Sequence, residues 1–400
     1  MVKKFVFLLW GSLIFQSVFA QTAFSFKGEA LQNAGCSVYI SDAEDGVIIF
    51  ETPQVSLVPA SVMKVVTSAA ALEILGPDFK FHTQLGMTGK INGEKGLLEG
   101  NLVIKGGCDP AFYSEYFSEH YKGTFETWAE ALSKAGIKTV QGDLIVDLTA
   151  LEGASAPGGW QWDDLGNYYG AGVSALTYSD NYYKIHFTTP AEPGKPVIIN
   201  SIEPAMDSLK LINNVFSSDV NSDHSNIYGA PGSYTQLVEG TIPGGRSDFV
   251  VKASMPAPAG TAAIEFVKVL KNCGIVFSGR IICVDKRMDK EFTLLAEKSS
   301  PSLRELIVPL NQESLNLYAE HLLREIGRAR KGFSSIDSSA VSLKEFWIEK
   351  KVSLMGFYPT DGSGLSRSNG ICPRTLGEIL RYVYLSPNRD DFFNRSESVV

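Results

Sequence analysis

The sequence is poor in histidine, and the residue patterns that usually hold a metal ion are absent from it. Its 400 residues include five histidines, with no His-Glu-x-x-His, no His-x-His and no histidine at ligand spacing from a cysteine. The Gly-x-Ser-x-Gly turn that carries the nucleophile of many Ser-His-Asp hydrolases is also missing. We therefore expect no metal site and no cofactor. The sequence also offers no nucleophile motif for a Ser-His-Asp hydrolase.

Cysteine is equally scarce. The five cysteines are too few and too dispersed for a disulfide scaffold. Cys273 and Cys283 flank an expected strand, and two alternatives stay open for them: a disulfide in an oxidising compartment, or buried free thiols. The odd count leaves at least one thiol free or in an intermolecular bond.

The chain has neither a cluster of basic residues nor, after its first twenty residues, a long apolar run. Its formal net charge is −8, and lysine and arginine are scattered along it, which excludes nucleic acid as an expected partner. With 44% hydrophobic and 20% charged residues, it is typical of a globular protein with two or three cores.

The first twenty residues have the pattern of a secretory signal peptide. Lys3 and Lys4 precede an apolar stretch from Phe5 to Phe15, and Ala20 ends a run with small residues at the positions that a signal peptidase reads. No cysteine follows Ala20 to accept a lipid, and the apolar stretch is short for a permanent anchor. We expect a periplasmic protein that starts near Gln21 and has no transmembrane anchor.

Ser61 and Lys64 form the most informative pair of residues. The segment from Val62 to Leu75 predicts a largely buried helix that begins after Pro59 and ends at Gly76-Pro77. Ser61, Lys64 and Ser68 fall on one face of it, so the amine lies beside the hydroxyl.

A free lysine amine has a pKa of about 10.4, and it becomes a usable base when burial lowers that value by several units. The alternative for this pair is structural: Ser61 as a helix cap and Lys64 as a surface residue with its amine in solvent.

A serine-lysine hydrolase also needs a second hydroxyl to relay the proton of the leaving group, and an amide to hold the substrate backbone. Two Ser-x-Asn segments fit, Ser179-Asp180-Asn181 in a β-rich stretch and Ser314-Leu315-Asn316 at the start of an expected helix. Ser314 alone is also compatible with a simple helix cap.

The order of expected elements is a hairpin, the Ser61 helix, a long insertion and a helical cluster. Strands at 36–40 and 47–51 form the hairpin, single strands are expected at 276–284 and 292–296, and helices at 302–310, 315–326, 338–351 and 373–384. The polar tail from Ser386 to Val400 is expected to be disordered.

Six longer segments resemble one known family, the penicillin-binding D-alanyl-D-alanine carboxypeptidases of the S13 serine peptidase class, which are low-molecular-mass class C penicillin-binding proteins. The likeness covers nearly all of the chain after residue 20. The segments are PASVMKVVTSAAALEILG (59–76), GNLVIKGGCDPAF (100–112), GDLIVDLTALEG (142–153), WQWDDLGNYYGAGVSAL (160–176), ESLNLYAEHLLREIG (313–327) and DGSGLSRSNGICPRTL (361–376).

The resemblance implies a site and a substrate. Ser61 would be the acylated nucleophile, Lys64 its base, and Ser314 with Asn316 the second catalytic pair, which leaves Ser179-Asp180-Asn181 as a chance match. Asp147 and Arg367 match family positions that hold the peptide side chain of the substrate, against the alternatives of a turn carboxylate and a surface ion pair. The substrate would be a peptidoglycan stem peptide, with β-lactam antibiotics as covalent inhibitors.

The resemblance also implies an α+β fold, a serine β-lactamase/DD-peptidase-like domain with an antiparallel sheet and a helical cluster. The implied organisation is a signal peptide at 1–20, a discontinuous peptidase domain at 21–85 and 290–400, and an inserted α/β accessory region at 86–289. A β-rich subdomain is expected within the insertion, at about 177–260.

One family element is missing: no lysine in the sequence is followed by Ser-Gly or Thr-Gly. In the family that element lies on an edge strand of the sheet and supplies an oxyanion-hole donor, whose loss typically lowers turnover by about 10² to 10³ fold. We therefore expect a chain truncated at its C-terminus, with the C-terminal part of the sheet missing. The alternative function is a catalytically crippled homologue that only binds or scaffolds the cell wall.

Overall fold

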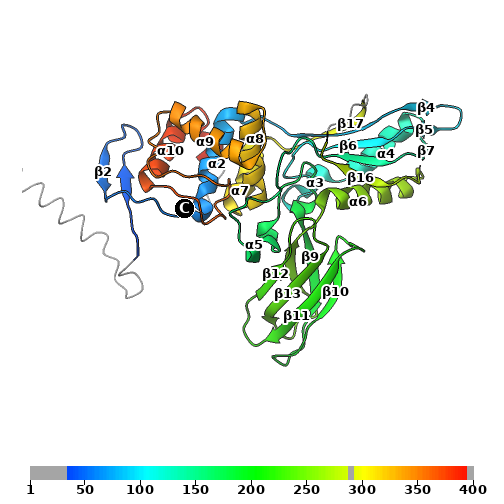
Figure 1. The fold of residues 1–400 in the computed structure, drawn as a ribbon, viewed down its shortest axis with the longest axis horizontal. Helices are drawn as coiled ribbons and strands as arrows, with labels where there is room; N and C mark the ends of the chain where they lie inside the picture. The colour runs from blue at the N-terminus through cyan, green and yellow to red at the C-terminus, as the bar shows by residue number, and fades with distance from the viewer. Residues whose placement is uncertain (1–33, 287–291, 394–400) are drawn as a thin grey trace, which may run out of the picture.

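The computed structural model describes residues 34–286 and 292–393, so the expected signal peptide lies outside the described residues. The chain forms three parts (Figure 1): a helical cluster, an α/β part beside it, and a β-rich part that projects below their junction. Among the described residues, no helix is both long enough and apolar enough to cross a membrane.

The helical cluster is built around α2 (Met63–Leu75), which is buried on nearly every side because its residues are small or apolar. The predicted helix is confirmed, and it ends at Gly76, which has a positive φ of 83° that glycine adopts at little cost. The helices that surround it are α7 (Leu303–Gln312), α8 (Asn316–Lys331), α9 (Ile336–Glu349) and α10 (Pro373–Leu385).

The expected hairpin is also confirmed. Strands β1 (Tyr39–Ser41) and β2 (Ile48–Glu51) pair antiparallel, and β1 packs against α10. Ile48 and Ile49 of β2 are exposed.

The expectation of a disordered tail is wrong for its first part, because α11 (Arg389–Phe393) follows α10. Phe392 is buried in the main core, and Asp391 pairs with Arg304 of α7. Burial of this aromatic side chain stabilises the short helix. The mostly polar sequence around Phe392 gives no sign of this burial.

The α/β part contains two sheets covered by α4 (Thr124–Lys134) and α6 (Pro258–Asn272), with the short α3 (Ser118–Tyr121) and η3 (Glu115–Phe117) beside them. The larger sheet has the order β16-β8-β6-β3-β17. Its strands are β3 (His82–Met87), β6 (Leu102–Lys105), β8 (Leu144–Asp147), β16 (Ile281–Val284) and β17 (Thr293–Ser299). This sheet extends beyond the expected limits of the insertion, 86 and 289, at both ends.

The smaller sheet has the order β15-β7-β5-β4. Its strands are β4 (Lys90–Asn92), β5 (Leu97–Glu99), β7 (Thr139–Val140) and β15 (Val276–Phe277). The single strand expected at 276–284 is therefore wrong: it is split into β15 and β16, which belong to different sheets. Gly279, between β15 and β16, lies very close to the backbone of Gly142. A Cβ on Gly279 would be 1.9 Å from the Gly142 carbonyl oxygen.

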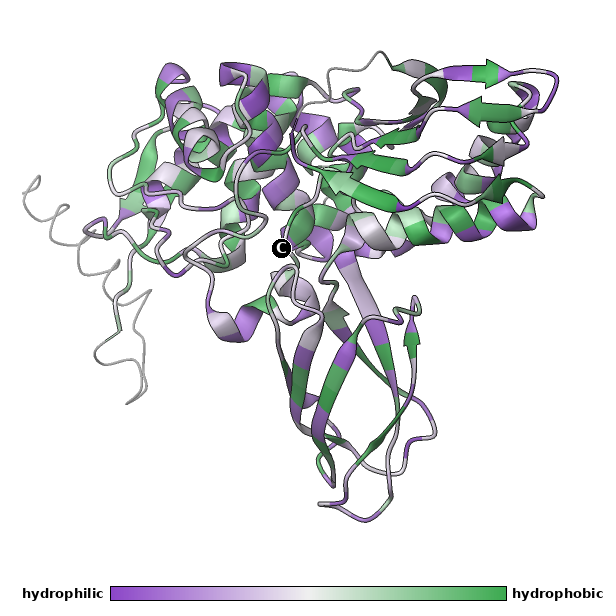
Figure 2. Cartoon of the chain, turned by 45° about the vertical axis from the view of Figure 1, so that its right-hand side comes forward, coloured by the Kyte–Doolittle hydropathy of each residue, from purple (hydrophilic) through white to green (hydrophobic). Residues whose placement is uncertain are grey.

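The β-rich part is a second, separate core formed by two three-stranded sheets, β10-β9-β14 and β11-β13-β12. Its strands are β9 (Tyr182–Thr188), β10 (Ile198–Glu203), β11 (Lys210–Ser218), β12 (His224–Tyr228), β13 (Thr235–Pro243) and β14 (Phe249–Ser254). Hydrophobic and hydrophilic residues alternate along these strands (Figure 2), as expected for sheets with one buried face.

A connector at 148–181 joins the three parts and includes α5 (Trp162–Leu165), η4 (Tyr168–Gly170) and η5 (Ser179–Asn181). The buried guanidinium of Arg324 on α8 donates hydrogen bonds to the carbonyl oxygens of Glu152 and Ala154 in this connector. The indole N–H of Trp160 donates to Asp361 in the loop before α10. The connector is thereby fixed against the helical cluster.

Candidate active site

The nucleophile candidate Ser61 lies in the 3-10 turn η2 (Ala60–Val62), directly before α2. No side-chain cap bond is present at the start of η2 or of α2, so Ser61 does not act as a helix cap. Its side chain is exposed, and Lys64 follows one helical turn later. The structural alternative for this serine therefore does not apply.

The amine of Lys64 is buried rather than extended into solvent, with only 2% of the residue exposed. Its Nζ lies 3.0 Å from Ser61 Oγ and 2.9 Å from the carbonyl oxygen of Ser363. Burial lowers the pKa of Lys64 to about 8, against the opposing charges of Glu320 and Asp361. A substantial fraction of this amine is therefore neutral near pH 8 and able to take a proton from Ser61.

Ser314 and Asn316 lie at the start of α8. Ser314 has a positive φ of 57° and precedes Leu315, the residue at the N-cap, which makes no side-chain cap bond. The Asn316 side chain donates a 2.7 Å hydrogen bond to the carbonyl oxygen of Tyr169 in the connector. The amide is thus held in place from outside its own helix.

One pocket of about 300 Å³ brings Ser61 together with Ser314 and Asn316, across more than 250 residues of sequence. Lys64 lies directly behind Ser61. The pocket is lined by Ser61, Tyr168, Tyr169, Asp180, Tyr182, Glu313, Ser314, Leu315, Asn316, Leu317, Tyr318 and Leu365.

The sequence did not predict that Asp180 would line this pocket, nor that four tyrosines would. These are Tyr168, Tyr169, Tyr182 and Tyr318. All three residues of Ser179-Asp180-Asn181 have positive φ, and the segment forms a tight turn at the pocket wall. The Asn181 side chain binds backbone groups of Tyr178 and Gly172, so it supports the turn and does not serve as a second substrate amide. The match is therefore structural, although it lies beside the site.

The loop 361–367 closes over the start of α2. Its Asp361 carboxylate accepts hydrogen bonds from the backbone N–H groups of Gly364 and Ser366 and from the side chains of Trp160 and Asn369. Gly364 has a φ of 85°, and a Cβ there would lie 1.7 Å from the carbonyl oxygen of Ala60. The loop therefore presses directly on the turn that carries Ser61.

Asp147 and Arg367, the expected substrate-binding residues, are not among the described residues that line the Ser61 pocket. Asp147 ends β8, and its carboxylate accepts hydrogen bonds from the N–H and the hydroxyl of Thr149. Arg367 is exposed in the loop 361–367, and its charge acts on Asp164 of α5. Their substrate contacts remain predictions.

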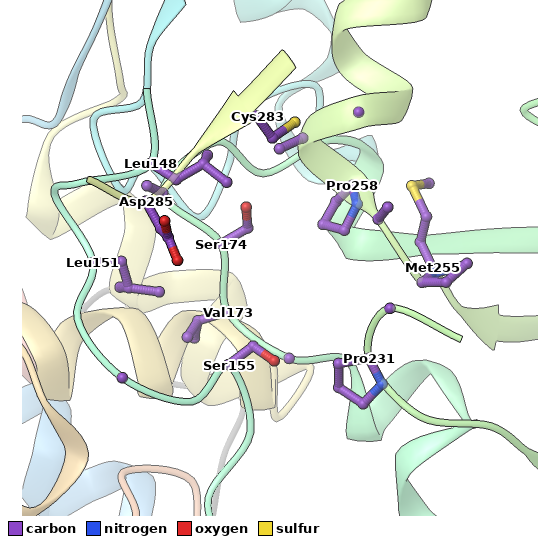
Figure 3. Close-up of a pocket in the computed structure, with 18 residues that line it drawn as sticks. Leu148, Leu151, Ser155, Val173, Ser174, Pro231, Met255, Pro258, Cys283 and Asp285 are labelled. Carbon is purple, nitrogen blue, oxygen red and sulfur yellow. The ribbon is translucent and has the colours of Figure 1, made fainter. Parts of the chain in front are cut away.

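A second pocket, of about 390 Å³, lies where the connector, the β-rich part and the start of α6 meet (Figure 3). Its walls are mainly apolar, with Leu148, Val173, Met255 and Pro258 among them, and the titratable groups in it are Cys283 and Asp285. It holds no pairing of a nucleophile with a base, so we place the candidate active site at Ser61. All five cysteines are free thiols, and both Cys273 and Cys283 are exposed rather than buried.

The chain is similar to known proteins over most of its length. Residues 20–395 match the family described as D-Ala-D-Ala carboxypeptidase 3 (S13). The D-alanyl-D-alanine carboxypeptidase of Actinomadura sp. (strain R39) is 28% identical over 359 residues, or 88% of this chain and 65% of that protein. The D-alanyl-D-alanine carboxypeptidase DacB of Haemophilus influenzae is 27% identical over 339 residues, or 82% of this chain and 66% of that protein. The chain thus spans just under two thirds of the length of these relatives.

The fold is similar to that of a solved structure. The crystal structure of penicillin binding protein 4 (dacB) from Haemophilus influenzae superposes with a TM-score of 0.75 at 24% identity, covering 89% of this chain and 76% of that one. This confirms the expected α+β DD-peptidase fold class. From the family match over residues 20–395, the chain belongs to the D-Ala-D-Ala carboxypeptidase 3 (S13) family.

Proposed function

We propose that the protein is a periplasmic serine-type D-Ala-D-Ala carboxypeptidase and endopeptidase that cleaves peptidoglycan stem peptides through an acyl-enzyme on Ser61. The observation that carries this proposal is the 3.0 Å contact between the buried Lys64 amine and the Ser61 hydroxyl. Membership of the S13 family and the pocket shared with Ser314 and Asn316 support it.

The chemistry follows from the order of these groups. Ser61 Oγ attacks the carbonyl carbon of the penultimate D-Ala while its proton passes to the neutral Lys64 amine. The C–N bond then breaks, and the leaving D-Ala amine receives a proton through the Ser314 hydroxyl. Water hydrolyses the resulting ester and restores Ser61. Asn316 would hold the substrate backbone, and Asp147 with Arg367 would contact its side chain.

The same acylation would make the protein a target of β-lactams, since their ring opens on an activated serine to give a stable ester. The Haemophilus influenzae penicillin binding protein 4 has been crystallised in complex with a β-lactam. For this chain we expect a covalent ester on Ser61.

Release of D-Ala from a peptide that ends in D-Ala-D-Ala tests the activity. The unaltered chain should release D-Ala, whereas Ser61→Ala and Lys64→Met should release none above background. Lys344→Met, at a partly exposed position of α9 outside the Ser61 pocket, is the matched control and should keep the activity. Release that persists in Ser61→Ala would contradict the proposal.

The alternative, a protein that only binds or scaffolds the cell wall, predicts a different outcome. It requires binding of peptidoglycan fragments that is unchanged by Ser61→Ala, together with no D-Ala release by the unaltered chain. Pull-down on insoluble peptidoglycan, measured beside the release assay, separates the two functions.

A further inference from the structure

The backbone of Ser363, in the loop 361–367, is held through both its carbonyl oxygen and its N–H. Its carbonyl oxygen accepts the 2.9 Å hydrogen bond from Lys64 Nζ. Its N–H donates a 2.8 Å hydrogen bond to Oε1 of Glu320 on α8, and the N–H of Gly362 donates to the same oxygen at 3.0 Å. One carboxylate oxygen thus fixes two successive peptide units. The next unit, formed by the Ser363 carbonyl and the Gly364 N–H, contacts the candidate base through its carbonyl and donates its N–H to Asp361.

Glu320 is placed to do this because α8 is rigid and deeply packed against α2. The residue is 1% exposed, and it lies one helical turn after Asn316, so the same helix carries the pocket amide and the carboxylate. Its second oxygen, Oε2, is buried without a hydrogen-bond partner among the described residues. A buried carboxyl group with an unused oxygen costs stability, which indicates a role other than holding the fold together.

We propose that Glu320 is a positioning residue for the Ser61–Lys64 pair: by accepting hydrogen bonds from the Gly362 and Ser363 N–H groups, it keeps the Ser363 carbonyl where it orients the Lys64 amine toward Ser61. This role rests on the proposed acyl-enzyme function and adds a residue that the Ser-x-x-Lys and Ser-x-Asn motifs do not contain.

The orientation matters because a neutral amine has two N–H donors and one lone pair. With one N–H given to the Ser363 carbonyl, the nitrogen can direct its lone pair at the Ser61 hydroxyl 3.0 Å away. Loss of the Glu320 acceptor would remove the two hydrogen bonds on the N-terminal side of the Ser363 carbonyl. Its peptide unit would then be held by the bond from the Gly364 N–H to Asp361, and we expect the carbonyl and the amine to shift. Misplacement of a reacting group by about 1 Å can lower a rate by about 10² fold.

Glu320 also acts through its charge, which develops in the pH range where Lys64 titrates, because burial and the charge of Asp361 raise the pKa of Glu320 to about 8. The groups that face the pair are Asp361 from the loop and Arg324 from the next turn of α8. When ionised, Glu320 raises the pKa of Lys64 and so reduces the fraction of neutral amine that can act as the base. Its oxygen has the separate effect of holding the loop that orients the amine. Geometry and charge can therefore be separated by substitution.

The test compares Glu320→Ala, which removes the acceptor, with Glu320→Gln, which keeps an acceptor oxygen and removes the charge. Glu325→Gln on the same helix is the matched control, because that buried carboxylate pairs with Arg328 and does not contact the loop. Two readouts are needed for the full-length chain: amide hydrogen exchange of peptides covering residues 360–366, and the rate of acylation by a fluorescent penicillin between pH 6 and 10.

We expect Glu320→Ala to lose protection at Gly362 and Ser363 and to be acylated about 10 to 100 fold more slowly across the pH range. Glu320→Gln should keep the protection and reach the plateau rate of the unaltered protein, with its pH midpoint moved to lower pH. Glu325→Gln should change neither readout. If Glu320→Ala does not fold, Glu320→Asp, which withdraws the acceptor by one methylene, replaces it.

Unchanged exchange or unchanged acylation in Glu320→Ala would overturn the role of Glu320 while leaving the proposed function intact. No acylation of the unaltered protein at any pH would instead contradict the proposed function itself, and the role of Glu320 with it. A pH midpoint in Glu320→Gln that equals that of the unaltered protein would show that the two groups are not coupled and would also count against the proposal.

Discussion

The amine of Lys64 and the hydroxyl of Ser61 lie 3.0 Å apart, one on the first turn of α2 and the other in the 3-10 turn before it. Helical spacing produces this contact, and burial of the amine makes it chemically useful. The loop 361–367 and helix α8 complete the surroundings of the pair.

The rate of acylation should depend on pH through Lys64. Burial lowers the pKa of this amine to about 8, and the neutral form is the one that accepts the serine proton. The rate should therefore rise with pH below about 8 and level off above it. Stopped-flow measurement with a fluorescent penicillin from pH 6 to 10 checks this, and a flat profile would rule out Lys64 as the titrating base.

The two Ser-x-Asn segments should behave differently when their serines are replaced. Ser314 and Ser179 both have positive φ, 57° and 52°, so alanine imposes a similar backbone cost at each. Ser314→Ala should reduce D-Ala release by about 10² to 10⁴ fold, because it removes the proposed proton relay. Ser179→Ala should leave release close to normal once differences in thermal stability are taken into account, and equal losses in both would contradict the assignment.

Gly364→Ala should disturb the nucleophile turn. Gly332, the C-cap of α8, is the matched control, since it too has positive φ but a Cβ there meets no atom within 4 Å. Gly332→Ala should cost about 1 kcal/mol of stability and leave acylation unchanged. Gly364→Ala should cost more, because its Cβ meets the Ala60 carbonyl, and should also slow acylation; urea unfolding and penicillin labelling measure the two effects.

Asp109, in the α/β part, should make stability depend on pH. It is 1% exposed, and burial raises the pKa of its carboxyl group from 3.8 to about 7. The folded chain keeps this proton up to about pH 7 and the unfolded chain loses it near 3.8. Stability therefore falls as pH rises through this window, by up to about 4 kcal/mol.

Asp109→Asn should remove this fall in stability with rising pH, because an asparagine side chain does not ionise. The hydroxyl of Tyr121, which donates to Asp109 at 2.6 Å, can rotate and accept a hydrogen bond from the new amide. We expect the variant to be more stable than the unaltered protein at pH 8 and not at pH 4, by urea unfolding. Asp207→Asn at an exposed position is the control, and a gain of equal size at both pH values would count against the assignment.

The elements that could be predicted from the sequence are those whose signal is local. The hairpin, the helix that carries Ser61 and the contact of Ser61 with Lys64 follow from turn residues and helical spacing. The two strands within 276–284 could not be predicted as separate, because the chain changes sheets there at a close approach to Gly142.

The site was predictable to the same extent. Its motif residues are recognisable by type and spacing, whereas the Ser363 carbonyl reaches Lys64 from 299 residues away and Glu320 acts through backbone groups of another segment. Asp180 lines the pocket only because the connector folds back on the helical cluster. Such long-range contacts leave no periodic trace in the sequence.

Acylation of Ser61 is tested most directly by locating a covalent penicillin adduct by mass spectrometry of the digested protein. We predict an added mass equal to one whole penicillin molecule on the peptide that contains Ser61, and no adduct on that peptide in Ser61→Ala. Folded protein that carries no adduct, or carries it on another residue while the Ser61 peptide is unmodified, would contradict the assignment of Ser61 as the nucleophile.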